Sequence, residues 1–523
     1  LDSFEKTHET KRDIRDLDTF NWAFLTEQIV ENLQTSPQFF PVFSNFSCNS
    51  DTNSISYTFY NFEGEEYYSG GAERYLLDLA LIHRNNGLTM RLYQFGTYHW
   101  VRFYGDLEVV GIPALPSFSG FRDVAKALDD EVSKEDRFTK LTIYSPFFIN
   151  NRKKNLPSIG ISHGVAWDNP ESNFHTAEEF WRNDGIYLSS ASNCSSLISV
   201  DTNTCNWFQT LNYEIGKSIK YLPNYVDLNV FKSGGEEARP SGQRIILYPR
   251  RLYSARGFDI VIEVMGRILA DYGDVIFKFV GKGFEQDTYK LVRQMGKSGS
   301  DRIKWFSLAP DEMYRVYKDA DITLIPTMYS EGTSLSCLEA LASGNGVIAT
   351  RIGGLTDLVI DGYNGLLIEP NADALEKAIR KLLDDEELLR KVKLNARETA
   401  TCFSKEKWRL SWENVLEHYL LPLTKSKSAK GDNREENKSK AVRRLLLKIE
   451  MSEINPQDPL PLFLKDKNLL KIVNSELRQG SYVFIVSQFS ELIKCSFRRL
   501  QFISSEKILD FVPEETICYK LRL

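Results

Sequence analysis

Short apolar runs alternate with longer segments of helical periodicity through the middle of the chain. Runs typical of buried strands lie at residues 55–60, 89–95, 141–144, 158–162, 197–200, 244–249, 275–280, 302–307, 321–326 and 347–350. Between several of these runs, apolar residues recur three and four positions apart, which predicts amphipathic helices. Strands that alternate with helices usually form parallel sheets, so we predict an α/β fold.

The most informative stretch joins two of these predicted strands, 321–326 and 347–350, through a loop and a helix that we expect to begin near Thr333. On that helix Glu339 falls on or beside the apolar stripe, where a carboxylate needs a partner. Glu331 comes just before the helix and would face whatever binds there.

The start of the same helix offers an anion site. Gly332, Thr333 and Ser334 supply backbone N–H groups where the helix dipole favours a negative group such as a phosphate. An alternative is purely structural, because Ser336 and Glu339 also fit a capping box, which would leave Glu331 as a solvated loop acid.

The wider context favours the functional interpretation. Glu331 and Glu339 are separated by seven residues and are followed by Ala-Leu-Ala-Ser-Gly at 340–344 and Ile-Gly-Gly-Leu-Thr-Asp at 352–357. This pattern resembles the donor-site signature of glycosyltransferase family 4, whose members are retaining enzymes of the GT-B fold. The resemblance implies two Rossmann-like domains facing across a cleft. It also implies that Glu331 contacts the donor sugar and Glu339 the nucleotide ribose.

Two further elements match the first domain of that family. Gly70 and Gly71 open a predicted helix, and the resemblance places them on the side of the cleft that faces the donor phosphates and the acceptor. A simple tight turn is the alternative. His163 ends the predicted strand 158–162, and by resemblance it is a positioning or proton-handling group beside the donor sugar. A structural or loop histidine is the alternative.

Cations follow the first strand of the second domain. Arg251 and Arg256 lie five residues apart on a loop, a spacing that suits a diphosphate, although solvated arginines are the alternative. They match the family's Arg and Lys, so Arg256 stands where Lys is usual.

The family's hinge is matched near Asn224, where Tyr225 replaces the usual glycine. A turn with positive φ would strain a tyrosine at this position. By resemblance, the backbone at the end of the strand 302–307 meets the nucleobase. In the alternative, Trp305 is an ordinary core residue.

These elements predict six segments of the chain. They are an N-terminal extension (1–54), a first Rossmann-like acceptor domain (55–225), a second Rossmann-like donor domain (226–403), a helix that returns to the first domain (404–424), a basic linker (425–445) and a small appended domain (446–523).

Length, charge and cysteine content limit the functions and cellular settings that the sequence allows. With 523 residues and a formal net charge of −6, the chain has room for two cores and no general attraction to nucleic acid. Seven scattered cysteines favour a reduced, cytoplasmic setting over a disulfide framework. No metal-ligand spacing or membrane-spanning run is evident. The basic linker is solvated in one interpretation and touches anionic lipid at the inner membrane face in the other.

We therefore expect a retaining, metal-independent hexosyltransferase that needs no cofactor. Its partners would be a nucleotide-diphosphate sugar donor and a glycan or lipid-linked acceptor, in cell-surface polysaccharide or glycoconjugate synthesis. The alternatives are a GT-B epimerase or phosphorylase, and a non-catalytic GT-B scaffold that binds nucleotide or glycan. The sugar, the base and the oligomeric state stay open.

Overall fold

The chain divides into two units by its internal contacts. One unit comprises Leu1–Tyr68, Leu76–Thr142 and Lys425–Leu523, and the other comprises Ser69–Tyr75 and Ile143–Thr424. The computed structural model describes residues 52–56, 70–85, 90–96, 100–104, 107–113, 126, 128–130, 139, 141–165, 168, 186–233, 242–283, 285–298, 300–425, 444–450, 482–486, 500–503 and 517–522.

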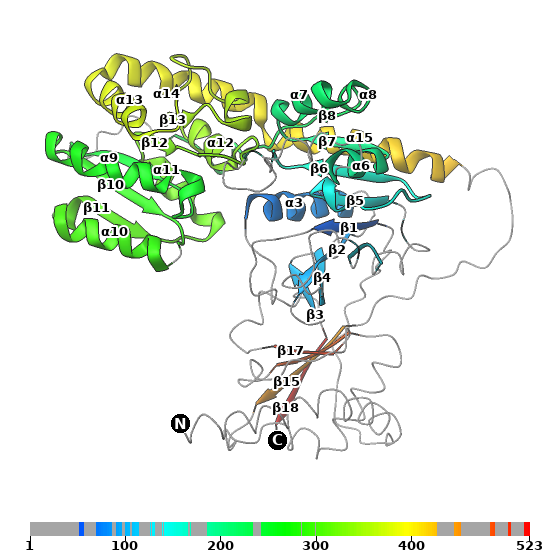
Figure 1. The fold of residues 1–523 in the computed structure, drawn as a ribbon. Coiled ribbons are helices and arrows are strands. Elements are labelled where there is room, and N and C mark those ends of the chain that lie inside the picture. The colour runs from blue at the N-terminus through cyan, green and yellow to red at the C-terminus, as the bar shows by residue number, and fades with distance from the viewer. Residues whose placement is uncertain are drawn as a thin grey trace, which may run out of the picture. The chain divides into compact units, whose positions relative to one another are not determined.

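The second domain contains a six-stranded parallel sheet (Figure 1). Its strands are β9 (Arg244–Tyr248), β10 (Val275–Val280), β11 (Ile303–Phe306), β12 (Ile322–Ile325), β13 (Gly346–Thr350) and β14 (Leu366–Ile368). They lie in the order β11-β10-β9-β12-β13-β14, the order of a Rossmann sheet, with all pairs parallel. All five strands predicted in this domain are confirmed, although those predicted at 302–307 and 321–326 are each one residue shorter at both ends.

Helices cover both faces of this sheet. They are α9 (Phe258–Asp271), α10 (Glu285–Ser298), α11 (Tyr314–Asp319), α12 (Leu335–Ala342), α13 (Ala372–Asp384) and α14 (Glu386–Ala400). Successive residues of β9 enter opposite cores: Ile246 and Tyr248 pack with α9 and α13, whereas Ile245 and Leu247 pack with α11 and α12. A strand buried on both faces needs an apolar side chain at every position, which explains the continuous apolar run.

The part of the first domain that belongs to the same unit has strands β5 (Leu141–Ser145), β6 (Ser158–Ser162), β7 (Ser196–Ser199) and β8 (Lys220–Tyr221), in that order. Helices α6 (Ile186–Asn193), α7 (Thr202–Leu211) and α8 (Tyr213–Gly216) connect them. Phe147 and Phe208 are fully buried in their core. The predicted strands at 141–144 and 158–162 are confirmed, and the one at 197–200 begins one residue earlier.

The other unit holds two groups of strands. Strands β1 (Thr52–Ser56), β2 (Met90–Gly96), β3 (Trp100–Tyr104) and β4 (Leu107–Pro113) lie in the order β3-β4-β2-β1. Strands β15 (Arg444–Glu450), β16 (Tyr482–Val486), β17 (Leu500–Ile503) and β18 (Ile517–Arg522) form a separate parallel sheet, β17-β16-β15-β18. Both groups appear in Figure 1.

The first strand was predicted too late in the chain. The apolar and aromatic alternation favoured 55–60, but backbone pairing begins at Thr52, opposite Met90, because a ladder uses backbone groups that polar residues also supply. The predicted boundary after residue 54 therefore falls inside β1. The boundary after residue 445 likewise falls inside β15. Residues 57–60, and most of the predicted extension and linker, lie outside the described residues.

The return helix is α15 (Lys405–Lys425), close to its predicted bounds. Its Trp412 Nε1 donates to the Tyr75 hydroxyl over 2.7 Å, and its Trp408 ring lies 4.1 Å from the ring of Tyr225. Tyr225 has no positive φ, so the turn accommodates a large side chain without the strain that a left-handed residue would suffer. None of the described helices is long and apolar enough to cross a membrane.

Candidate functional site

The candidate site lies where β9 and β12 end as neighbours in the sheet. The chain order reverses between these strands, and such a switch point is where open α/β sheets bind ligands. The two loops that follow them pack closely, since Met328 N–H donates to Ala255 O over 3.0 Å. Gly257, at φ 76°, lies so close to Pro326 that a Cβ would come within 1.8 Å of its carbonyl oxygen. The two loops therefore form one platform.

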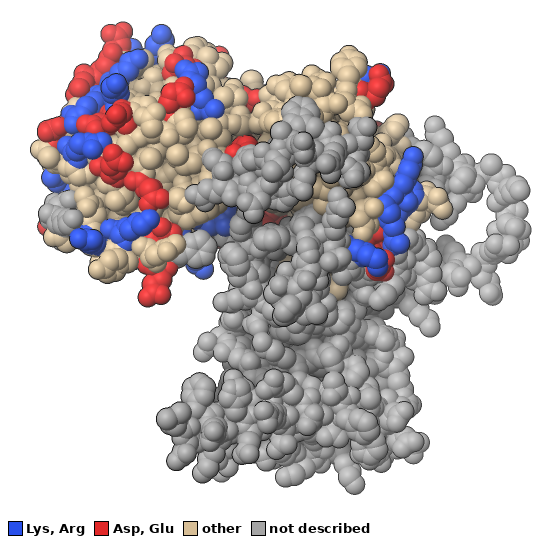
Figure 2. All heavy atoms as spheres, viewed as in Figure 1, with Lys and Arg blue, Asp and Glu red and all other residues tan. Residues whose placement is uncertain are grey.

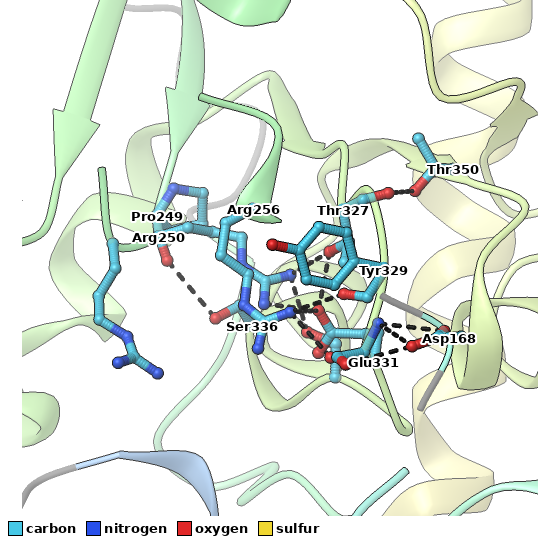
Figure 3. Close-up of polar contacts among 12 residues, drawn as sticks. Asp168, Pro249, Arg250, Arg256, Thr327, Tyr329, Glu331, Ser336 and Thr350 are labelled. Carbon is cyan, nitrogen blue, oxygen red and sulfur yellow. Dashed lines mark hydrogen bonds and ion pairs between the residues drawn. The ribbon is translucent and has the colours of Figure 1, made fainter. Parts of the chain in front are cut away.

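Glu331 is buried at the centre of this platform (Figure 3). Its Oε2 accepts from Arg250 Nη2 at 2.6 Å and from the Thr327 hydroxyl at 2.7 Å, and it lies 3.4 Å from Arg256 Nη1. Burial would raise the pKa of this carboxyl, but the two arginines and these hydrogen bonds outweigh burial and lower its pKa below the ordinary value. Glu331 is therefore a fixed, ionised acceptor.

The arginine that binds Glu331 most closely was missed in the sequence. Arg250 immediately precedes the predicted Arg251, and its side chain is only 8% exposed, as befits a partner in a buried pair. Arg251 instead lies 5.7 Å from the ring of Tyr253, on which Arg256 also packs at 5.8 Å. The tandem Arg-Arg was the available signal, but spacing alone cannot say which of two adjacent side chains points inward.

Arg256 also orders the backbone before Glu331. Its Nη1 donates to Tyr329 O at 3.2 Å and to Ser330 O at 2.8 Å. On the other side of this turn, the carboxylate of Asp168 accepts from Ser330 N–H at 2.9 Å. Asp168 was not singled out in the sequence, because an acid that follows the strand at 158–162 by six residues carries no recognisable motif.

The Gly-Thr-Ser segment is crowded by the first domain. A Cβ on Gly332 would lie 2.5 Å from His163 O, so only glycine fits there. Thr333 donates its hydroxyl proton to Val200 O at 2.7 Å and accepts from Asn224 N–H at 2.9 Å. Ser334 lies 3.4 Å from Arg250 Nη1. The Thr333 side chain thus joins the two domains, and binding of an anion by the backbone N–H groups of this segment stays a prediction.

Glu339 lies on α12, which begins at Leu335, two residues later than predicted, and Thr333 is held in the domain contact. It is 3% exposed, and its Oε1 accepts from Arg74 Nη2 at 2.8 Å. The expected partner therefore exists. The capping-box alternative is wrong, because Ser334 is the N-cap and Ser336 lies within the helix, too late to cap it.

Arg74 belongs to α3 (Gly71–Asn85), whose start meets the start of α12. A Cβ on Gly71 would contact Leu335 at 3.5 Å, and Gly70 O accepts the Arg74 N–H. In the same turn Glu73 is buried, which raises its pKa to about 7 against the opposing charge of Arg251. The structure thus brings Gly70 and Gly71 to the Glu339 side of the platform.

His163 follows β6, as predicted, and is half-buried. Its Nε2 lies 2.7 Å from the Ser145 hydroxyl, and its ring meets the edge of Tyr75 at 5.3 Å. Desolvation lowers the pKa of the imidazole to about 4, so His163 is neutral at physiological pH. Its carbonyl touches Gly332, which places this strand end beside the platform.

Trp305, which lies on the strand whose backbone is predicted to meet the nucleobase, is not a core residue. It is 37% exposed on β11, and its Nε1 donates to Gly281 O at 3.0 Å. On the face shown in Figure 2, acidic and basic side chains are interspersed over the second domain. Arg250 and Arg256, which bind at Glu331 and at the turn before it, lie on the loop after β9.

Comparison with known proteins shows which family part of this chain matches and which proteins it is similar to. Residues 232–399 match the family model described as Glycosyl transferases group 1. The chain is 27% identical over 184 residues to a lipopolysaccharide 1,2-N-acetylglucosaminetransferase of Salmonella typhimurium, covering 34% of this chain and 46% of that protein. It is 33% identical over 211 residues to an uncharacterized glycosyltransferase of Methanocaldococcus jannaschii, covering 38% and 57%. The chain spans about half the length of these curated relatives.

Solved structures agree on the fold. A sucrose-phosphate synthase from Thermosynechococcus elongatus superposes with a TM-score of 0.58 at 17% identity, covering 71% of this chain and all of that one. Anabaena HepE in complex with UDP and glucose superposes with a TM-score of 0.55 at 18% identity, covering 70% and 100%. The chain therefore contains a glycosyl transferases group 1 domain within a GT-B fold of two Rossmann-like domains, as predicted.

Proposed function

We propose that this protein is a retaining glycosyltransferase that moves a hexosyl unit from a nucleotide-diphosphate sugar to an acceptor hydroxyl. The observation that carries the proposal is the placement of Glu331 and Glu339 on one loop and helix, at the switch point of a Rossmann sheet, with arginines around them. The match of residues 232–399 to the group 1 family supports the same class.

In this proposal the two carboxylates divide the donor between them. Ionised Glu331 accepts hydrogen bonds from hydroxyls of the sugar, and Glu339 accepts those of the ribose. Both groups are buried, so each hydrogen bond forms away from competing water. Retention of configuration rests on the resemblance to family 4, and we assign no covalent nucleophile.

The departing diphosphate gains negative charge as the glycosidic bond breaks. Arg251 and Arg256 follow β9 on the loop that joins the platform, and fixed positive charge there stabilises the leaving group in the transition state. The backbone N–H groups of Gly332, Thr333 and Ser334 add to this field. Because the protein itself supplies the charge, we propose that transfer needs no metal and no cofactor.

His163 is proposed to act at the junction of sugar and acceptor. Its neutral imidazole offers one nitrogen to Ser145 and leaves the other available for a hydroxyl. The acceptor is proposed to be a glycan or a lipid-linked glycan used in cell-surface polysaccharide or glycoconjugate synthesis, with a cytoplasmic site of action. A contact of the basic linker with anionic lipid belongs to the same proposal.

Calorimetric titration tests the donor site first. UDP, GDP and ADP are titrated into the wild type, Glu339→Ala and Glu387→Ala without added metal. Glu387 is an exposed residue of α14 and provides a matched Glu-to-Ala control. Binding of one nucleotide that is lost only in Glu339→Ala supports the proposal and selects the base.

Transfer is then assayed with sugars of the selected base and a panel of glycan acceptors. Release of nucleoside diphosphate that depends on acceptor, and a product with the donor's anomeric configuration, are the expected results. A protein that binds the nucleotide sugar but shows neither transfer nor slow hydrolysis would be a scaffold, and the catalytic proposal would be wrong.

A further inference from the structure

The turn just before Glu331 has an unusual backbone. Ser330 has φ 55°, and it is the one non-glycine residue with a positive φ among the residues that the structure describes. An L-residue in this region loses about 1–2 kcal/mol relative to an ordinary conformation, because its Cβ crowds the backbone. Such a conformation persists only where surrounding contacts hold it.

The contacts that hold Ser330 come from Arg256 and Asp168, which are labelled in Figure 3. Arg256 binds its carbonyl oxygen at 2.8 Å. Asp168 binds its N–H with both carboxylate oxygens, at 2.9 and 3.1 Å, and its hydroxyl at 3.2 Å. Arg256 belongs to the second domain, whereas Asp168 belongs to the first.

Ser330 directly precedes Glu331, so the conformation of this turn affects the position of Glu331. The two residues share a peptide bond, so the dihedral angles of Ser330 set the direction in which the Glu331 backbone and side chain leave the turn. Glu331 O in turn accepts from Gly354 N–H at 3.0 Å, and a Cβ on Gly353 would lie 2.1 Å from the same oxygen. With so little room, a different conformation at Ser330 would move the Glu331 carboxylate.

We propose that Asp168 is a positioning residue for the donor sugar: it holds Ser330 in its left-handed conformation and thereby aims Glu331. This inference rests on the proposed function, because it assumes that Glu331 contacts the sugar. It adds that the sugar subsite is complete only while the first domain contacts the turn, so that recognition of the sugar and contact between the domains are coupled.

The same two domains share a second carboxylate contact, which provides a control. Asp357 accepts from Thr202 N–H at 2.7 Å and from the Thr202 hydroxyl. It therefore joins the same domains with the same chemistry. The residue that it holds, however, begins a helix and is not in a left-handed conformation. Loss of either contact weakens the domain junction, and only loss of the Asp168 contact releases Ser330.

The experiment compares Asp168→Ala, Asp357→Ala and each of them combined with Ser330→Gly. Glycine adopts positive φ without help, so it restores the turn when Asp168 is absent. The readout is the ratio of the dissociation constants of UDP and UDP-glucose, with GDP and GDP-mannose measured in parallel. This ratio reports the sugar subsite separately from the nucleotide subsite.

We expect Asp168→Ala to reduce the preference for the sugar nucleotide about tenfold, with the affinity for the nucleotide little changed. Ser330→Gly should recover most of that preference in Asp168→Ala and should recover nothing that Asp357→Ala loses. A preserved preference in Asp168→Ala, or equal behaviour of the two double variants, would overturn the inference.

Failure of the proposed function gives a different pattern. If the wild type binds neither nucleotides nor sugar nucleotides, or binds both with no preference, then Glu331 has no donor-sugar role for Asp168 to support. If the wild type shows the preference and Glu331→Gln loses it, the function stands, and only the Asp168 variants decide the inference.

Discussion

The two carboxylates of the central motif are only eight positions apart, yet their surroundings differ. Glu331 lies on a loop and is held by Arg250, by Thr327 and, at longer distance, by Arg256, all from its own domain. Glu339 lies on a helix, and its ion-pair partner is Arg74 of α3, whose side chain is 31% exposed.

In the proposed function, this difference gives the two carboxylates different binding roles. The surroundings of Glu331 keep it ionised and immobile, which suits a contact that must be geometrically precise in the transition state. Glu339 has a partner that is 31% exposed, so in the proposed function the ribose hydroxyls share its carboxylate with Arg74. The comparison therefore predicts that changes at Glu331 affect turnover and that changes at Glu339 affect nucleotide affinity.

The largest expected effect comes from Glu331→Ala. It should lower kcat about a hundredfold, because a charged contact with the reacting sugar is lost. It should also reduce the free energy of unfolding by about 3–5 kcal/mol, since Arg250 is left buried without its carboxylate. Glu331→Gln should lose turnover with less destabilisation. Denaturant unfolding and the transfer assay measure the two effects. Equal unfolding free energies for both variants would contradict the buried-pair account.

Glu339→Ala should weaken nucleotide binding roughly 30-fold through loss of charge-assisted hydrogen bonds, with kcat at saturating donor little changed. Titration calorimetry and initial rates separate these quantities, and Glu387→Ala again serves as the control. A variant that keeps its nucleotide affinity but loses kcat would reverse the roles assigned to the two carboxylates.

Removing Arg250, the main cation beside Glu331, should change how the free energy of unfolding depends on pH. In the wild type the pKa of Glu331 is lowered, so its contribution to stability is complete above the ordinary value of 4.5 and is lost as the pH falls through the lowered pKa. In Arg250→Met burial dominates and raises the pKa above the ordinary value, so the sign reverses: the free energy of unfolding falls as the pH rises from 4.5 through the raised pKa. Unfolding measured between about pH 3 and pH 7 tests this prediction.

Glu73, whose pKa is raised to about 7, titrates in the same range but in both proteins, so the difference between the two pH profiles isolates Glu331. Parallel profiles for the wild type and Arg250→Met would mean that Arg250 does not set the ionisation of Glu331.

The smallest expected effect comes from Arg74→Lys. A lysine keeps the charge beside Glu339 but loses the planar geometry of the guanidinium, so nucleotide affinity should fall only about threefold. The same substitution should leave the preference for sugar nucleotide over nucleotide unchanged. A loss as large as that of Glu339→Ala would show that Arg74 itself binds the nucleotide.

Much of the second domain was predictable because local rules act strongly there. Buried parallel strands such as 275–280 need continuous apolar residues, and helix α13 begins with an Asn371 cap that bonds Ala374 N–H, both readable from the chain. The strand at 52–56 was misplaced because its backbone pairing does not depend on an apolar side chain at each position.

The sequence by itself determined the α/β alternation, the positions of Glu331, Glu339 and His163 relative to strand ends, and the cationic loop after β9, because these depend on local periodicity and short motifs. Only the tertiary structure decided that Arg250 faces Glu331, that Arg74 pairs with Glu339, and that Asp168 holds Ser330. Each of these contacts joins residues more than 80 positions apart, and side-chain direction at such range is set by packing, which no local pattern encodes.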